Sequence, residues 1–177
     1  MPGKGGKAWE IAGLLWTLAA GNALHFVYDW TGRSTVAALF AAVNESTWEH
    51  MKLLAVPYIL FSLVEVLCRR EDTVAMPRAV GLLVGLAAIP ALFYTWKGIT
   101  GLEIMAVDIG IFQISVAAGC FVSWRLQRRR RLAGPGWTAI GLTVLVGVWA
   151  VFLLWTFRPP ELPLFMDPLT KSYGLGG

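Results

Sequence analysis

Charged side chains are scarce in this sequence. Only 15% of its 177 residues are Asp, Glu, Lys or Arg, whereas a soluble globular domain carries about a quarter. More than half of the residues, 56%, are hydrophobic, and nine are tryptophan. The mean hydropathy is +0.62. This composition excludes an ordinary soluble domain and predicts a polytopic membrane protein whose main partner is membrane lipid.

Cysteine and nucleic-acid-binding signals are also sparse. The two cysteines, Cys68 and Cys120, fall near helix ends that we expect on the cytoplasmic side, so no disulfide framework is expected. The formal net charge is +4. The basic residues occur in short runs between apolar segments rather than over a soluble surface, so we expect no nucleic-acid partner.

Five apolar stretches are each long enough to cross a hydrocarbon core of about 30 Å. A shorter apolar piece, 36–43, follows a candidate cap at Ser34 and is expected to form a re-entrant or interfacial helix. The sequence therefore predicts an all-α polytopic membrane helix bundle in a single domain. The expected spans are 8–28, 46–68, 77–96, 102–124 and 137–157, followed by a proline-rich tail, 158–177.

Two features of the spans have further implications. The first span could instead be a cleaved signal peptide, because Gly21-Asn22-Ala23 is a tolerable cleavage site, but its length and Glu10 favour a retained helix. Gly81 and Gly85 have the spacing that permits close helix contact, within the bundle or in a homo-oligomer.

The basic residues predict the orientation of the spans. Cytoplasmic segments of membrane proteins carry an excess of Lys and Arg. A cytoplasmic N-terminus and an outer tail, in the cell membrane, would place ten of the fifteen basic residues inside, namely Lys4, Lys7, Arg69, Arg70, Arg78, Arg125, Arg128, Arg129, Arg130 and Arg131.

Polar side chains gather at the outer ends of these spans. The stretch 44–52 combines carboxylates, an imidazole, an amide and an ammonium group just before a long apolar run. Intramembrane ionisable residues are costly and mark functional sites. The inner half shows nothing comparable: Glu65 and Arg69 have the spacing of an ordinary ion pair.

Histidine nitrogens and carboxylate oxygens together suit zinc or another divalent cation. The expected metal ligands are His25, Asp29, Glu45, His50 and Asp108. The candidate catalytic residues are Glu45, Glu49 and Asp108. The candidate substrate-binding residues are Asn22, Tyr28, Asn44, Lys52, Tyr94 and Asp167.

Structural roles compete with these assignments. Ser46-Thr47-Trp48-Glu49 has the pattern of a capping box, in which Ser46 accepts from the backbone and Glu49 reaches back. Lys52 can pair with a neighbouring glutamate or extend to the interface. His25 can form an interhelical hydrogen bond. Asp108 is the hardest to assign to structure alone, because a carboxylate that deep in a span needs a partner or a proton.

Three functions therefore stay open. The first is a metal-dependent hydrolase acting on a lipid or lipid-linked substrate, although no H-E-x-x-H motif supports a zinc site. The second is a cation- or proton-coupled transporter or channel for a small solute. The third is a non-catalytic structural or accessory protein held together by a polar network.

Four blocks of the sequence resemble an uncharacterised family of small bacterial integral membrane proteins, a domain-of-unknown-function group. The most specific are an NESxWEH block from Asn44 to His50 and a PPxLPLFxDP block from Pro159 to Pro168. The others are residues 25–32 and 93–95. The resemblance implies a small multi-span membrane protein and no assigned activity. Because the tail block is partly apolar, we expect it to fold back as a lid over the outer polar site.

Overall fold

The computed structural model describes residues 4–176, and the regular elements in that range are all helical. Five of the helices are long and apolar enough to cross a membrane. In chain order the elements are α1 (Lys4–Trp30), α2 (Thr35–Ala38), α3 (Thr47–Arg69), α4 (Ala75–Thr100), α5 (Met105–Arg129), α6 (Pro135–Phe157) and the 3-10 helix η1 (Gly174–Gly176).

The expected all-α architecture is confirmed, with modest changes at the element ends. α4 runs to Thr100 rather than to residue 96 and ends at Gly101, whose φ of +68° favours glycine. The short helix expected over residues 36–43 is reduced to the four residues of α2. Ser34 does cap it, since its side chain accepts a hydrogen bond from the backbone N–H of Val36.

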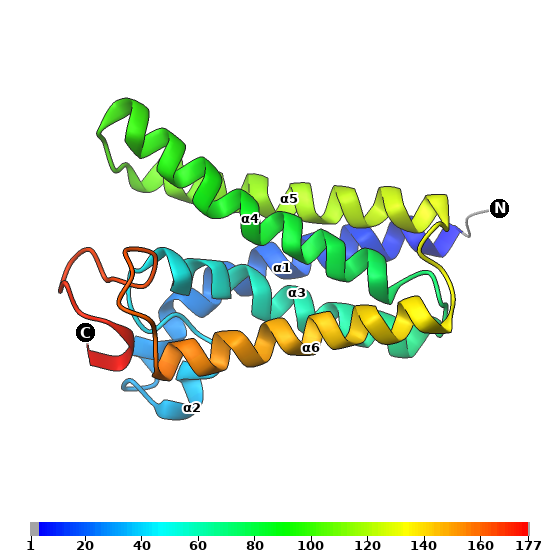
Figure 1. The fold of residues 1–177 in the computed structure, drawn as a ribbon, viewed down its shortest axis with the longest axis horizontal. Coiled ribbons are helices and arrows are strands. Elements are labelled where there is room, and N and C mark those ends of the chain that lie inside the picture. Colours follow the sequence, from blue (N-terminus) through cyan, green and yellow to red (C-terminus); the bar gives the residue numbers. More distant parts are fainter. Residues whose placement is uncertain (1–3, 177) are drawn as a thin grey trace.

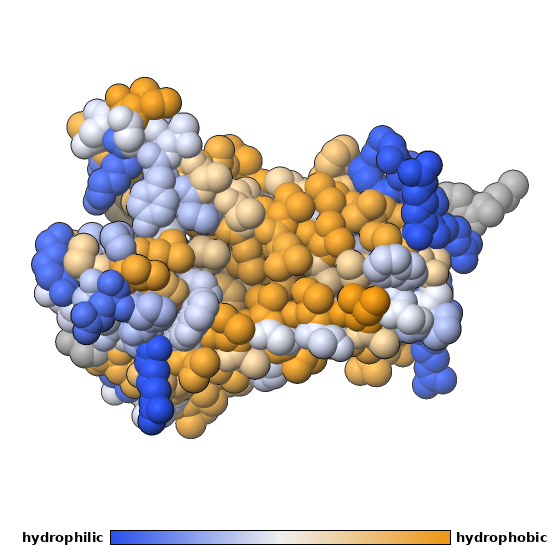
Figure 2. Space-filling view, viewed as in Figure 1, coloured by the Kyte–Doolittle hydropathy of each residue, from blue (hydrophilic) through white to orange (hydrophobic). Residues whose placement is uncertain are grey.

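The five long helices lie lengthwise, and successive ones run in opposite directions (Figure 1). One end of the bundle carries the start of α1 and the end of α5; we call it the arginine end, after the run 128–131. The other carries the start of α3 and residues 158–176, and we call it the tail end. Figure 2 shows an apolar band between two hydrophilic ends, the pattern that a bilayer requires.

The central helix of the bundle is α3. Residues 51–59 are all buried, as expected for a helix that is hydrophobic on every side. At the start of α3, the Trp48 ring stacks on Phe152 of α6 with ring centroids 4.3 Å apart. Phe165 of the tail lies 4.8 Å from the same ring. The tail segment is therefore part of the hydrophobic core.

Helices α4 and α5 pack closely through small residues. A Cβ atom added at Gly81 would lie 2.5 Å from the carbonyl oxygen of Gly119, and one added at Gly119 would lie 2.6 Å from the carbonyl oxygen of Gly81. Real Cβ atoms do not approach a carbonyl oxygen this closely. Gly81 thus serves a contact inside the chain, as small residues do between membrane helices.

Replacing Gly81 by alanine is expected to force α4 and α5 apart and to destabilise the fold by about 1–3 kcal/mol, the usual cost of overpacking. Thermal unfolding of the purified protein in detergent measures this effect. Gly98→Ala is the matched control, because no atom lies within 4 Å of a Cβ added at Gly98. Equal melting temperatures for the two variants would contradict the close contact.

A buried charge network joins the helices at the arginine end. Arg78 of α4 is 1% exposed. Its Nη1 atom lies 3.0 Å from Oε2 of Glu10 in α1, and its Nε donates to Oε2 of Glu65 in α3 at 2.7 Å. Two carboxylates from different helices therefore share one guanidinium group.

The network continues into α5 and to the protein surface. Gln127 donates to Oε1 of Glu10 at 2.7 Å, and Arg69 donates both to Oε1 of Glu65 at 2.5 Å and to Oε1 of Gln127 at 2.8 Å. Beyond the spans, partial burial disfavours ionisation of Glu71, but the hydrogen bond and charge of Arg69 outweigh burial and lower the pKa of Glu71. The ionised Glu71 carboxylate therefore stabilises the fold through its contact with Arg69, and this stabilisation is lost as the pH falls and Glu71 takes up a proton.

The expected Glu65–Arg69 ion pair is confirmed, but the expectation that this end holds nothing comparable to the outer polar residues was wrong. The pair exists, but it belongs to a network drawn from α1, α3, α4 and α5. Sequence spacing did not reveal it because the partners are far apart in the chain: Glu10 and Gln127 are separated by 117 residues. Arg78 was assigned to a cytoplasmic helix end, where an exposed arginine would be ordinary.

Candidate functional site

Three predicted metal ligands meet at the tail end. His25 comes from the last turns of α1, Glu45 from the loop before α3, and His50 from the first turn of α3. One ligand atom from each lies within 4.8 Å of the other two. Glu45 Oε1 is 3.7 Å from Nε2 of His25, and Glu45 Oε2 is 3.5 Å from Nε2 of His50. We call these three residues the His–Glu–His cluster.

One ring nitrogen of His50 is held by the backbone. Its Nδ1 atom lies 3.0 Å from the carbonyl oxygen of Ser46. A carbonyl oxygen can only accept a hydrogen bond, so Nδ1 carries a hydrogen, and whenever the ring is neutral its lone pair is at Nε2. This arrangement is common in metal-binding histidines, whose second nitrogen is held by a backbone carbonyl or a carboxylate.

The Nε2 lone pair of His50 faces the Glu45 carboxylate, and both groups are electron-rich. A positive charge between them, either a proton or a metal ion, would satisfy both. The same reasoning applies to His25, whose ring centroid is 5.4 Å from that of His50. The side chains of the cluster are 29% to 43% exposed, so an ion from solution can reach them.

Glu45 is positioned by the residues on either side of it. The Asn44 side chain accepts from the backbone N–H of Ser46 at 2.9 Å and donates to the carbonyl oxygen of Gly174 at 2.9 Å. The backbone N–H of Trp48 donates to the carbonyl oxygen of Leu164 at 3.0 Å. Two points of the tail therefore hold the loop that carries Glu45.

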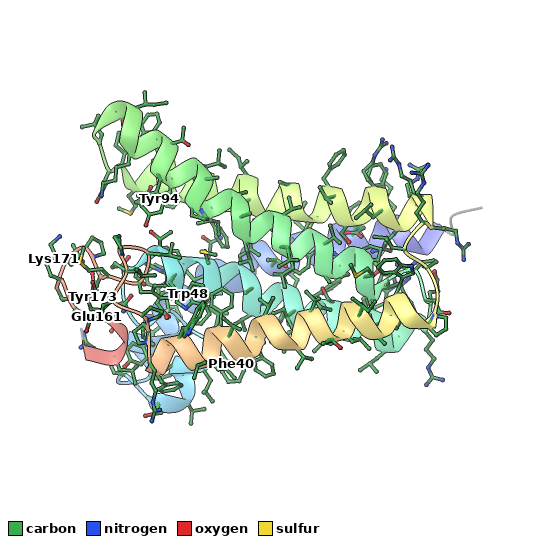
Figure 3. The ribbon with its side chains drawn as sticks, in the orientation of Figure 1. Phe40, Trp48, Tyr94, Glu161, Lys171 and Tyr173 are labelled. Carbon is green, nitrogen blue, oxygen red and sulfur yellow. The ribbon has the colours of Figure 1, made fainter. Side chains whose placement is uncertain are left out.

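The tail itself is ordered by Asp167, which is 4% exposed. Its carboxylate accepts from the backbone N–H of Leu169 at 2.8 Å and from the Thr170 hydroxyl at 3.0 Å. These bonds close a turn that brings Met166 opposite Tyr173. The tail folds back beside Trp48 (Figure 3), while its expected role as a lid over the outer polar site stays a prediction. Asp167 stabilises its own segment, and its predicted contact with a substrate is not needed to explain its burial.

Replacing Asn44 by alanine is expected to loosen Glu45. Each lost hydrogen bond contributes about 0.5–1.5 kcal/mol to stability, and loss of support for a metal ligand lowers metal affinity about 10-fold to 100-fold. Thermal unfolding and zinc titration measure the two effects. Asn22→Ala is the control, since the exposed Asn22 amide bonds only to its own helix at Leu18. Unchanged zinc affinity in Asn44→Ala would show that the tail does not position Glu45.

Two other predicted site residues, Glu49 and Lys52, form a buried ion pair away from the cluster. Lys52 Nζ lies 2.5 Å from Oε2 of Glu49, and the two side chains are 0% and 2% exposed. The Thr156 hydroxyl of α6 bonds to both, and Lys52 also donates to the carbonyl oxygen of Ala38. The pair joins α3 to α6 and to the last residue of α2. No motif or spacing in the sequence pointed to Thr156.

The predicted capping box is only half formed. Ser46 Oγ accepts from the backbone N–H of Glu49 at 3.3 Å, as expected. The Glu49 carboxylate does not return to Ser46 but accepts from the backbone N–H of Val43 at 3.1 Å. Ser46 N–H instead donates to Asn44. The reason is that Lys52 draws the Glu49 carboxylate into the core.

Asp108 lies next to the cluster but outside it. It is close enough to His50 for the two charges to interact, yet it is not within the 4.8 Å group. Within residues 4–176, its Oδ1 atom is buried without a hydrogen-bond partner. A buried carboxylate oxygen without a partner is costly and suggests a role in binding or proton transfer.

The remaining predicted residues lie apart from the cluster. Asp29 is 76% exposed and pairs with Arg33 at 3.5 Å. Tyr28 is part-buried on the same turn of α1. Tyr94 lies on the outer part of α4, where α4 and α5 lean away from the other helices, and is separated from Trp48 and Tyr173 (Figure 3). None of these placements brings a further ligand to His25, Glu45 and His50 in the part of the chain that the structure describes.

Two imidazoles and one carboxylate form the ligand set found in several catalytic zinc sites, which use three protein ligands and keep a fourth position open. The same donors also suit other divalent first-row metals. Without a metal, the two histidines and Glu45 can share protons. The cluster can therefore hold a divalent cation or exchange protons.

Comparison with known proteins places the chain in a family. No curated protein matches it, and no solved structure matches it either. A family model described as "Family of unknown function (DUF6512)" matches residues 4–175, nearly the whole chain. This match covers α1 to α6, the His–Glu–His cluster and the tail. The chain belongs to DUF6512, a family of unknown function.

Proposed function

We propose that this chain is a multi-pass protein of the cell membrane that binds a divalent cation of the zinc type through His25, Glu45 and His50. We further propose that it uses this ion to hydrolyse a lipid or lipid-linked substrate at the outer face. The observation that carries the proposal is the approach of three ligand atoms from separate segments to within 4.8 Å of one another.

The proposed orientation has a cytoplasmic N-terminus and an outer tail. It is supported by the concentration of arginine at one end of the bundle, because basic residues accumulate on the cytoplasmic side. The His–Glu–His cluster lies at the opposite end (Figure 1). It would then face the exterior, close to the headgroups of the outer leaflet. A substrate that stays in the membrane could reach it without entering the bundle.

The proposed metal ligands have suitable chemistry and support. His50 is held with its Nε2 lone pair toward Glu45 by the Ser46 carbonyl, and Glu45 is held by Asn44 and the tail. A zinc ion in such a site polarises a substrate oxygen and lowers the pKa of water to about 7. His25, Glu45 and His50 would fix the ion, leaving one position open for substrate or water.

Asp108 is the proposed general base. Its proximity to His50 and its unpartnered buried oxygen, noted above for residues 4–176, support this role. A carboxylate at this position could take a proton from the attacking water and return it to the leaving group. Glu49 is not assigned a catalytic role, because its carboxylate is committed to Lys52 and Thr156.

Vesicles made from total bacterial membrane lipid test this function. The purified chain is reconstituted, stripped of metal with a chelator, and reloaded with zinc, and lipid products are followed by mass spectrometry. We expect products only after reloading, and a loss of at least about 100-fold in rate for Asp108→Asn with zinc binding retained. Metal-loaded protein that forms no product would contradict the hydrolase assignment but leave the metal site intact.

Proton- or cation-coupled transport is a second candidate, favoured by the part-buried Asp108 in the first turn of an apolar helix, near enough to His50 for their charges to interact. Reconstituted vesicles with an internal pH dye measure it. Proton or cation flux that Asp108→Asn abolishes would support a transporter. If substitutions in the cluster only lower the melting temperature, without altering metal binding, flux or lipid products, the cluster is structural.

A further inference from the structure

A cavity of about 270 Å³, open along the side of the bundle, lies between α1 and α5 near the arginine end, at the opposite end of the bundle from the His–Glu–His cluster (Figure 1). Its wall is apolar and is formed by Ile11, Leu14, Ala117 and Phe121. Pockets for compact organic ligands usually run from about 300 to 1,000 Å³, so this cavity is small. It suits one stretch of a flexible apolar chain.

The mouth of the cavity carries positive charge. Lys7 lines it from α1, and Trp124 lines it from α5. The guanidinium group of Arg128 lies 5.1 Å from the centre of the Trp124 ring, in a cation–π contact. Lys7 and Arg128 are both exposed. One cation, Lys7, thus lines the apolar cavity, and a second, Arg128 on another helix, lies against a tryptophan that lines it.

Glu10 also lines the cavity, but it does not oppose a negative ligand. Its Oε1 accepts from Gln127 and Ser123, and its Oε2 pairs with Arg78. Its charge is therefore neutralised inside the bundle. The end as a whole is strongly basic, with the ten basic residues named above against four acidic ones, Glu10, Glu65, Glu71 and Asp72.

We propose that this cavity binds one phospholipid with an anionic headgroup. An acyl chain would lie against Ile11, Leu14 and Phe121, and the headgroup phosphate would lie between Lys7 and Arg128. Basic pockets between membrane helices recognise anionic headgroups in this way, through charge and hydrogen bonds to phosphate oxygens. The proposal is independent of the metal site and of the orientation of the chain.

Native mass spectrometry of the full chain in detergent tests this site. Phosphatidylglycerol is titrated as the anionic probe and phosphatidylcholine as the matched zwitterionic probe. We expect a clear preference for phosphatidylglycerol, lowered about fivefold by either Lys7→Gln or Arg128→Gln, since each cation near a headgroup contributes about 1 kcal/mol. Ala117→Phe fills the cavity and is expected to weaken binding of both lipids.

Arg131→Gln is the control, because it removes the same charge from the same run outside the contact with Trp124. It should change phosphatidylglycerol binding by less than about twofold, the effect of a distant screened charge. Soluble glycerol phosphate in excess should not displace the lipid, because it lacks an acyl chain. Equal effects of Arg131→Gln and Arg128→Gln, or equal affinity for the two lipids, would overturn the proposal and indicate diffuse surface attraction.

Discussion

Replacing Arg78 by leucine is expected to destabilise the fold by about 3–5 kcal/mol, the usual cost of removing one partner from a buried ion pair. Arg78 is the charge partner of Glu10 and also donates to Glu65. Its removal leaves Glu10 buried with neutral partners, Ser123 and Gln127. A charged carboxylate left without a cation in a low-dielectric interior is strongly unfavourable. Thermal unfolding in detergent, followed by size-exclusion chromatography, measures the loss.

Two further variants make this prediction specific. Arg125→Leu removes an exposed arginine at the same end and is expected to change stability little. The double variant Arg78→Leu with Glu10→Leu removes both charges of one pair and is expected to recover part of the loss, as seen when buried pairs are replaced by apolar side chains. If Arg78→Leu melts at the same temperature as Arg125→Leu, the network does not hold the helices together.

Replacing His50 by alanine is expected to lower zinc affinity by more than about 100-fold. Loss of a residue that only hydrogen-bonds to a metal ligand costs about 10-fold to 100-fold in affinity. His50 is assigned as a direct ligand, so its loss should cost more. The variant should fold, because the His50 side chain is part-exposed and its contacts, with the Ser46 carbonyl at the start of its own helix and with the part-exposed Glu45, do not lie in the core. Competition with a fluorescent zinc chelator measures the affinity.

Asp29→Asn is the matched control for this experiment. Asp29 is a carboxylate on the same helix as His25, but it lies at the exposed end and pairs with Arg33. The zinc affinity of the Asp29→Asn variant should stay within about twofold of that of the unchanged protein, because distant exposed charges are screened. A similar loss of affinity in Asp29→Asn and His50→Ala would mean that the ion binds nonspecifically at the acidic outer end.

Several features of the fold could be predicted because they depend on local sequence. Long apolar runs imply membrane helices wherever they occur, and all five long helices were located in this way. The approach of His25, Glu45 and His50 was also foreseeable in part. Antiparallel neighbouring helices bring the end of one span to the start of the next, so polar groups at those positions share one end of the bundle.

The side-chain partners inside the bundle could not be predicted. Glu49 and Lys52 look like members of an outer polar site in the sequence, yet Thr156 of α6, 107 residues from Glu49, completes a buried structural pair. Arg78 looks like an ordinary cytoplasmic arginine, yet it is buried against α1 and α3. Helix rotation decides whether a polar side chain faces its neighbours or the lipid, and a single sequence does not determine that rotation.

The position of Asp108 could also be predicted only in part. Its predicted depth within a span signalled an unusual role, whereas in the structure it lies in the first turn of α5, with its Oδ1 atom buried and without a hydrogen-bond partner among residues 4–176. Its distance from the His–Glu–His cluster, however, depends on the way α4 and α5 lean away from the bundle at the tail end (Figure 1). The sequence contains no local signal for that lean.

X-ray absorption on purified, zinc-loaded protein tests the central claim most directly, since it reports both the amount of bound metal and its ligands. The proposed site predicts one zinc ion per chain, with two imidazole nitrogens and a carboxylate oxygen at about 2.0–2.2 Å. Zinc content that is unchanged in a His25→Ala, His50→Ala double variant, or a zinc spectrum without imidazole ligands, would contradict it.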